Sequence, residues 1–202
     1  MPAGAANGGD VAVVARDLGT GASRIVTKGR QVTDPVVADW PRVGWGETVA
    51  TTLAAGQASY YFAVEDVGSG QTYGVDLLAG VTSATLMNID LSGTTLVWRL
   101  QTGGGSGEVL MRDLTGGTTQ PVASGPGLSG GSIDGDVVVW SQPAGGVTSI
   151  MCRRFSGGTP FAVATVATGR VTDVLVSGDT VAWIVEGGQN GFNGIETSRL
   201  AQ

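Results

Sequence analysis

The stretch Gly135-Asp136-Val137-Val138-Val139-Trp140 decides the fold, because close copies of it recur along the chain. Two copies, at 93–98 (GTTLVW) and 178–183 (GDTVAW), also end in tryptophan. A less regular copy at 46–51 (GETVAT) has a threonine, Thr51, in that place. The three tryptophans follow one another at intervals of 42 and 43 residues, and Thr51 precedes the first of them by 47. A period of this length predicts a fold built from repeated supersecondary units.

Each copy is apolar at nearly every position after its second residue, which is typical of a strand buried on both faces. A second strand recurs after a loop and ends in charged residues, most clearly at 109–116 (VLMRDLTG). A short third strand follows a Thr/Gly turn, as at 120–123, and a further apolar segment precedes each repeated glycine. Four strands, a to d, in about 42 residues predict the blade of a propeller, in which the repeated stretch is strand b.

The succession of Gly-Asp-x-Val-Val-Trp, a loop, Ile-x-x-Arg-Asp-Leu-x-x-Gly and Pro-Val-Ala resembles the TolB-like (WD40-like) β-propeller repeats over residues 10–200. The resemblance implies an all-β fold of four-stranded antiparallel blades, about four in this chain. It also implies a periplasmic or extracellular location. It is specific for the fold and weak for function, because propellers serve as binding scaffolds, lyases and gating domains of serine peptidases alike.

We expect a disordered segment at 1–9 and a single propeller domain at 10–202, with repeats near 10–45, 46–92, 93–134, 135–177 and 178–202. The chain begins with a c and a d strand, holds three full repeats and ends after a fifth c strand. Its two ends therefore do not complete one blade. We expect a partial or open ring that can self-associate through its open blade edges, with a closed four-bladed ring as the alternative.

Charge and composition exclude several classes of partner. The net charge of −6 and the sequence pI near 4.5 disfavour nucleic acid and anionic membrane surfaces. No run approaches the roughly 18 apolar residues of a membrane span, and the N-terminus lacks the basic and apolar regions of a signal peptide. We therefore expect no nucleic-acid partner and no membrane insertion.

Catalytic and metal chemistry is also disfavoured. The chain has no histidine, so it cannot form a Ser-His-Asp or Cys-His arrangement, and a zinc site would have one cysteine and carboxylates only. The lone Cys152 lies in an apolar strand, where a buried and inert thiol is expected. We predict no catalytic residue, no metal and no cofactor. Aspartates at repeating positions are expected to accept hydrogen bonds from turn amides; these are Asp17, Asp66, Asp113, Asp136 and Asp179.

The turns alternate between the two faces of a blade, and the loops between strands b and c and between d and the next a are the long ones. We expect a ligand on the face that carries them. The segment 28–40 departs from the repeat and is read as a loop on this face, with Trp40 as a contact for a sugar, peptide or partner loop. In the alternative, Trp40 packs on the neighbouring blade. The candidate binding residues are Lys28, Arg30, Asp34, Asp39 and Trp40, with a second group of Asn190, Phe192 and Asn193 in the loop 187–194.

These observations predict a non-catalytic scaffold that binds a protein or carbohydrate partner through its long loops. One alternative is the gating propeller of a prolyl-oligopeptidase-like serine hydrolase whose catalytic domain lies outside this chain. A Gly-x-Ser-x-Gly motif with a downstream histidine in the neighbouring coding sequence would favour it. A second alternative is a carbohydrate-active propeller.

Overall fold

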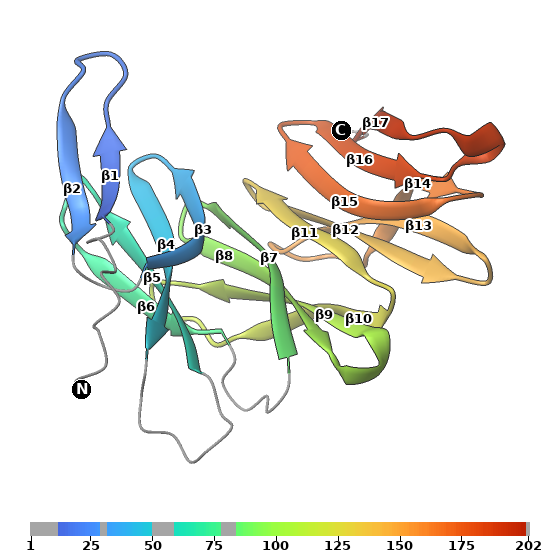
Figure 1. Ribbon diagram of the computed structural model, residues 1–202, viewed down its shortest axis with the longest axis horizontal. Helices are drawn as coiled ribbons and strands as arrows, with labels where there is room; N and C mark the ends of the chain where they lie inside the picture. Colours follow the sequence, from blue (N-terminus) through green and yellow to red (C-terminus); the bar gives the residue numbers. More distant parts are fainter. Residues whose placement is uncertain (1–11, 29–31, 50–58, 78–83, 201–202) are drawn as a thin grey trace, which may run out of the picture.

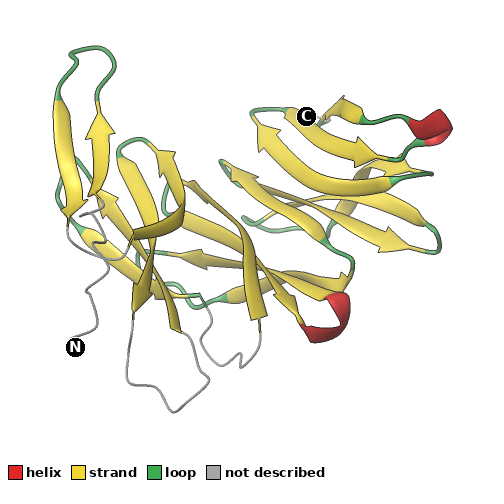
Figure 2. Cartoon of the chain, in the orientation of Figure 1, coloured by secondary structure: helices red, strands yellow, loops and turns green. Residues whose placement is uncertain are grey.

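The computed structural model describes residues 12–28, 32–49, 59–77 and 84–200, and these residues form strands, turns and two short 3-10 segments (Figures 1 and 2). The strands belong to five antiparallel sheets. Among the described residues, neither 3-10 segment is long and apolar enough to cross a membrane.

The five sheets follow the order of the chain. The first contains β1 (Ala12–Arg16) and β2 (Ser23–Lys28), and the second contains β3 (Val32–Asp39), β4 (Arg42–Val49), β5 (Ser59–Asp66) and β6 (Thr72–Asp76). The third contains β7 (Ala84–Ser92), β8 (Thr95–Thr102), β9 (Ser106–Asp113) and β10 (Gln120–Pro126). The fourth contains β11 (Ser129–Asp134), β12 (Val137–Ala144), β13 (Val147–Arg154) and β14 (Phe161–Val166), and the fifth contains β15 (Arg170–Ser177), β16 (Thr180–Glu186) and β17 (Gly194–Arg199). The segments η1 (Gly103–Gly105) and η2 (Gln189–Gly191) lie between strands b and c of the third and fifth sheets.

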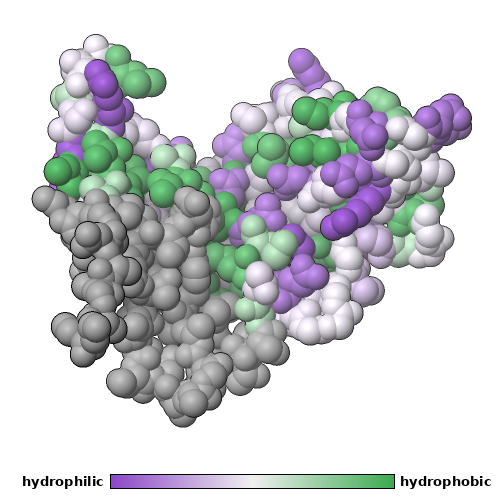
Figure 3. All heavy atoms as spheres, viewed as in Figure 1, coloured by the Kyte–Doolittle hydropathy of each residue, from purple (hydrophilic) through white to green (hydrophobic). Residues whose placement is uncertain are grey.

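The sheets are the blades of a β-propeller, which confirms the predicted fold. In each complete blade the strands pair in chain order, and the a strands β3, β7, β11 and β15 contact one another in succession. The blades follow one another along an arc (Figure 1). The first blade has strands c and d, the last has a, b and c, and these two lie at opposite ends of the arc. A notch separates the two ends in the space-filling view (Figure 3), so the described part of the chain forms an open ring.

The hydrophobic core lies between successive blades. Of the four core clusters in the described residues, each joins side chains of one sheet to those of the next. Trp98, Trp140 and Trp183 are each the fourth residue of a b strand, and each is at most 5 % exposed. Cys152 is also buried in this core, and burial raises the pKa of its thiol, as expected of an inert cysteine.

The first copy of the repeated strand b does not lie at 46–51, where the sequence suggested it. Trp45, 3 % exposed, is the fourth residue of β4 and is therefore the true counterpart of Trp98. The copy proposed at 46–51 is wrong, and the boundary drawn at residue 46 falls inside β4. The cause is a longer blade: β4 ends at Val49 and β5 begins at Ser59, whereas β12 and β13 are joined by a two-residue turn.

Three of the repeated aspartates are turn anchors, as predicted. Asp17 accepts hydrogen bonds from the amide of Gly19 at 2.7 Å, and the carboxylates of Asp66 and Asp113 accept from the amides two or three residues further on. Asp136 and Asp179 differ. Asp136 accepts from Ser156 Oγ and forms an ion pair with Arg154, and Asp179 faces Arg199 at 3.8 Å, so these two tie the a–b turn to strand c.

A hydrogen bond repeated from blade to blade joins the a–b turns. In the first three a strands, β3, β7 and β11, the last residue accepts a hydrogen bond from the amide of the turn residue in the next blade. Asp39 accepts from Gly93 at 2.5 Å, Ser92 from Gly135 at 2.9 Å and Asp134 from Gly178 at 2.6 Å. Gly135 and Gly178 both have φ of 57°, a conformation that glycine adopts without the penalty of a side chain.

Candidate functional site

The segment 28–40 is not the long loop that the sequence suggested. β2 ends at Lys28, and residues 32–39 form β3, the first strand of a complete blade. The β-branched residues Val32, Thr33, Val36 and Val37 explain the strand, and the register shifts between Thr33 and Val36. Arg30 lies outside the described residues, as do the side chains of Lys28 and Asp34.

Asp39 and Trp40 lie at the end of β3 that is remote from the long loops. The Asp39 carboxylate is occupied by the amide of Gly93, so it acts as a link between blades. Trp40 is 63 % exposed and stands where later blades have the turn glycine. It lines a shallow cavity of about 310 Å³ with Arg16 and Leu18 from the β1–β2 turn. The expectation that Trp40 shares a face with the long loops is therefore wrong.

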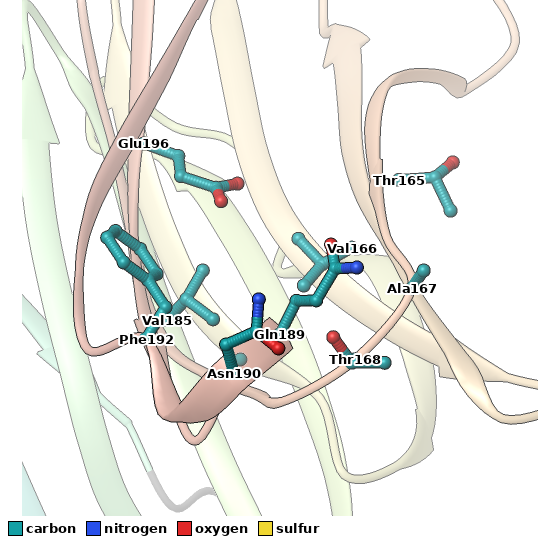
Figure 4. A pocket seen from close by; sticks show the side chains of 10 residues that line it. Thr165, Val166, Ala167, Thr168, Val185, Gln189, Asn190, Phe192 and Glu196 are labelled. Atoms are coloured by element: carbon teal, nitrogen blue, oxygen red, sulfur yellow. The ribbon is translucent and has the colours of Figure 1, made fainter.

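The second predicted group lies at a pocket between the fourth and fifth blades (Figure 4). The cavity of about 360 Å³ opens between the end of β14 and the loop from β16 to β17. Both segments belong to the face of the long loops. The lining residues are Thr165, Val166, Ala167, Thr168, Val185, Gly188, Gln189, Asn190, Phe192 and Glu196.

The loop that forms one wall is shaped by its own hydrogen bonds. Asn190 has φ of 58°, and the Gly188 amide donates to the carbonyl oxygen of Phe192 at 2.8 Å, which closes a tight turn. Asn193 Oδ1 accepts from the Gly187 amide at 2.7 Å. Asn193 therefore holds the loop in place, whereas Asn190 and Phe192 line the pocket.

Phe192 supplies the aromatic surface of the pocket. Its side chain is 45 % exposed, and its ring lies over Gly194, where a Cβ atom would come within 2.4 Å of Cζ. Glu196 supplies the charge, and its Oε2 accepts a hydrogen bond from Trp183 Nε1 at 2.9 Å. Figure 4 shows the side chains of Gln189 and Asn190 between this wall and that of Thr165 and Thr168. The pocket thus combines an aromatic face with amide, hydroxyl and carboxylate groups, which suits a polar ligand with an apolar face.

Sequence reasoning missed Glu196, although its position carries a signal. It pairs across the strands with Trp183, and the corresponding partners of Trp45, Trp98 and Trp140 are Ala63, Leu110 and Met151. A carboxylate therefore stands at a position that is apolar in the three complete blades. Among the described residues that line the pocket, Glu196 is the single acidic one, and the described part of the chain contains no cluster of three side chains suited to a metal.

Comparison with known proteins supports the fold. No family model and no curated relative matches the sequence. Solved structures that match include a prolyl endopeptidase at 16 % identity, with a TM-score of 0.60 over 82 % of this chain and 26 % of that chain. Pyrococcus horikoshii acylaminoacyl peptidase matches at 10 % identity, with a TM-score of 0.63 over 95 % of this chain and 35 % of that chain.

A third match is the β-propeller domain of the Trilobed protease from Pyrococcus furiosus, described as having an open velcro topology. It is 12 % identical, with a TM-score of 0.56 over 86 % of this chain and 57 % of that chain. This chain thus spans less than two thirds of each of these three structures. At such identities the likeness concerns the propeller fold alone.

Proposed function

We propose that this propeller is a non-catalytic binding scaffold whose ligand sits in the pocket of Phe192, Asn190 and Glu196. The observation that carries the proposal is an exposed aromatic ring beside amide and carboxylate groups on the face of the long loops. A sugar ring fits this chemistry, because its apolar face can stack on Phe192 while its hydroxyl groups bond to Gln189 and Glu196. Most glycosidases use a pair of carboxylates. Glu196 is the one carboxylate among the described residues that line the pocket, which supports binding over hydrolysis.

Glycan-array screening followed by calorimetric titration of the best glycan tests this proposal. Phe192→Ala should weaken binding by about tenfold or more, as expected for an aromatic anchor. Trp40→Ala is the matched control, because it removes an exposed aromatic from the opposite face. Equal affinity of Phe192→Ala and the natural chain would contradict the proposed site. If peptides bind in the pocket and glycans do not, the scaffold recognises protein partners.

The second candidate function is the gating propeller of a serine hydrolase. It is favoured by the likeness of this chain to parts of two longer peptidases. The coding sequence on either side of this segment separates the two functions. A Gly-x-Ser-x-Gly motif and a downstream histidine in the same reading frame would support the peptidase.

We also propose a periplasmic or extracellular location, which rests on the resemblance to TolB-like repeats. Immunoblots of fractionated cells should detect the protein outside the cytoplasm. Recovery in the cytoplasmic fraction alone would contradict the location and leave the binding site untouched.

A further inference from the structure

A second cavity lies on the same face and contains a buried arginine. It has a volume of about 190 Å³ and is enclosed by the end of β8, the loops that follow β8 and β10, and the start of β15. Three successive blades contribute to it. Arg99 and Arg170 line it together with Gly105, Gly127 and Ser129.

Arg99 departs from the repeat. It follows the core tryptophan of β8, and the same position is held by Gly46, Ser141 and Ile184 in the other b strands. The side chain is only 7 % exposed. Nε donates to Asn88 Oδ1 at 3.3 Å and Nη1 to the carbonyl oxygen of Leu128 at 2.6 Å. Nη2 makes no hydrogen bond within the described residues. The guanidinium group is therefore held in place by Nε and Nη1, and Nη2 remains available as a donor.

The charge around Arg99 is not balanced. Arg170, an exposed residue, brings a second guanidinium to the cavity. The nearby carboxylate of Asp173 is engaged by the Val174 amide at 2.9 Å and by Asn88 Nδ2 at 3.4 Å. Burial lowers the pKa of Arg99 and so does Arg170, whereas Asp173 raises it. The cluster is thus locally positive, although the net charge of the whole chain is −6. A bound anion would therefore stabilise it.

We propose that this cavity binds a carboxylate group, received between the guanidinium groups of Arg99 and Arg170. A guanidinium presents parallel N–H donors that match the two oxygens of a carboxylate. The cavity is smaller than the roughly 300 Å³ at which ligand pockets begin, so it accommodates a terminal group and not a whole ligand. The free C-terminus of a peptide and an acidic side chain share this chemistry.

Amide NMR titration of the ¹⁵N-labelled chain tests the proposal. N-acetyl-alanine stands for a chain end, the α-amide of N-acetyl-aspartate for an acidic side chain, and N-acetyl-alanine amide is the neutral control. A carboxylate probe should shift the Gly105 and Gly127 amide signals in a saturable manner, and the neutral probe should not. The carboxylate probe that binds more tightly shows whether the natural ligand is a chain end or an acidic side chain.

Two substitutions in the cavity and one control outside it test the specificity of binding. Arg170→Gln should weaken binding by about tenfold, the loss expected for one charge-assisted hydrogen bond, without unfolding the chain. Arg199→Gln removes an arginine that is 82 % exposed at the far end of β17 and should change nothing. Arg99→Lys keeps the charge and loses the planar fork, so it should also weaken binding.

Equal shifts with the neutral probe, or unchanged binding in Arg170→Gln, would overturn the proposal. Tighter binding of inorganic phosphate than of either carboxylate would overturn the choice of ligand. The site is independent of the glycan pocket, so Phe192→Ala should leave the carboxylate titration unchanged.

Discussion

At the scale of single residues, Trp98 and Trp140 occupy the same position of successive blades but differ in one hydrogen bond. Trp140 Nε1 donates to Gln142 Oε1 at 3.2 Å, whereas Trp98 Nε1 is buried without a partner among the described residues. Replacement by phenylalanine removes a satisfied donor in one case and an unsatisfied one in the other. We expect Trp140→Phe to destabilise the chain more than Trp98→Phe, by about 1 kcal/mol.

Urea unfolding followed by circular dichroism measures the difference. Trp140→Ala should cost about 3–5 kcal/mol, as for other buried aromatic truncations. A loss within about 0.5 kcal/mol would place Trp140 at the surface and contradict its role in the core between blades.

The turn aspartates make stability depend on pH. Hydrogen bonds from the amides of Gly19, Ser69 and Thr115 lower the pKa of Asp17, Asp66 and Asp113 respectively below the ordinary value of 3.8. A carboxyl group whose pKa is lower in the folded chain than in the unfolded chain stabilises the fold at pH values above its unfolded pKa. This contribution is lost as the pH falls through the folded pKa. We expect the free energy of unfolding to drop below about pH 4.

Replacement of all three by asparagine provides the check. The variant should be less stable at pH 7 and should lose less stability between pH 5 and pH 3 than the natural chain. Parallel pH profiles of the two proteins in urea titrations would show that other groups govern acid unfolding.

Several residue roles could not be read from the sequence. Asn190 and Phe192 were proposed because they lie in a long loop on the expected ligand face, whereas Glu196 was not proposed because it lies inside a strand. Trp40 was assigned to the wrong face because residues 32–39 were taken as a loop, and one strand length separates the two faces of a blade.

At the scale of elements, the bonds between a–b turns distinguish an internal blade from a terminal one. Asp134 ends β11 and accepts from the Gly178 amide, whereas Ser177 ends β15 at the corresponding position and is exposed, with no blade beyond it in the described chain. Asp134→Ala should cost about 1 kcal/mol. Ser177→Ala, its matched control, should stay within about 0.5 kcal/mol.

Thermal unfolding of both variants measures the effect. Equal losses would mean that the bond between turns contributes nothing beyond the local strand end. The repeat itself made the strand order predictable in the third, fourth and fifth blades, because the tryptophan position fixes strand b there. The prediction failed in the second blade, where the longer connection between β4 and β5 lengthens the period.

At the scale of the whole molecule, the last blade has one face that no other described residues cover. The first five residues of β8 and of β12 are all buried, whereas buried and more exposed residues alternate along β16. Leu175, Ile184 and Ile195 are 53 %, 37 % and 69 % exposed. Figure 3 shows apolar residues at the surface of this end of the molecule. We propose that the chain self-associates through this face, whereas the sequence-based expectation was self-association through open blade edges.

Sedimentation velocity at increasing concentration tests the self-association. The natural chain should form dimers or larger species, and the double substitution Leu175→Lys with Ile184→Lys should return it to the monomer. Leu18→Lys changes a residue that is 92 % exposed at the opposite end and is the control. A monomer that melts sharply at all concentrations would contradict the proposal.

The packing of each blade against its neighbours also bears on how such a chain changes over generations. Among the described residues, the hydrogen bonds between blades join adjacent blades, apart from the bond between Asn88 and Asp173. Duplication or deletion of a whole coding unit of about 42 codons would therefore preserve the contacts within every remaining blade. Blade number can thus change by recombination within the gene, whereas the pocket between the fourth and fifth blades is kept only where both of these blades remain adjacent.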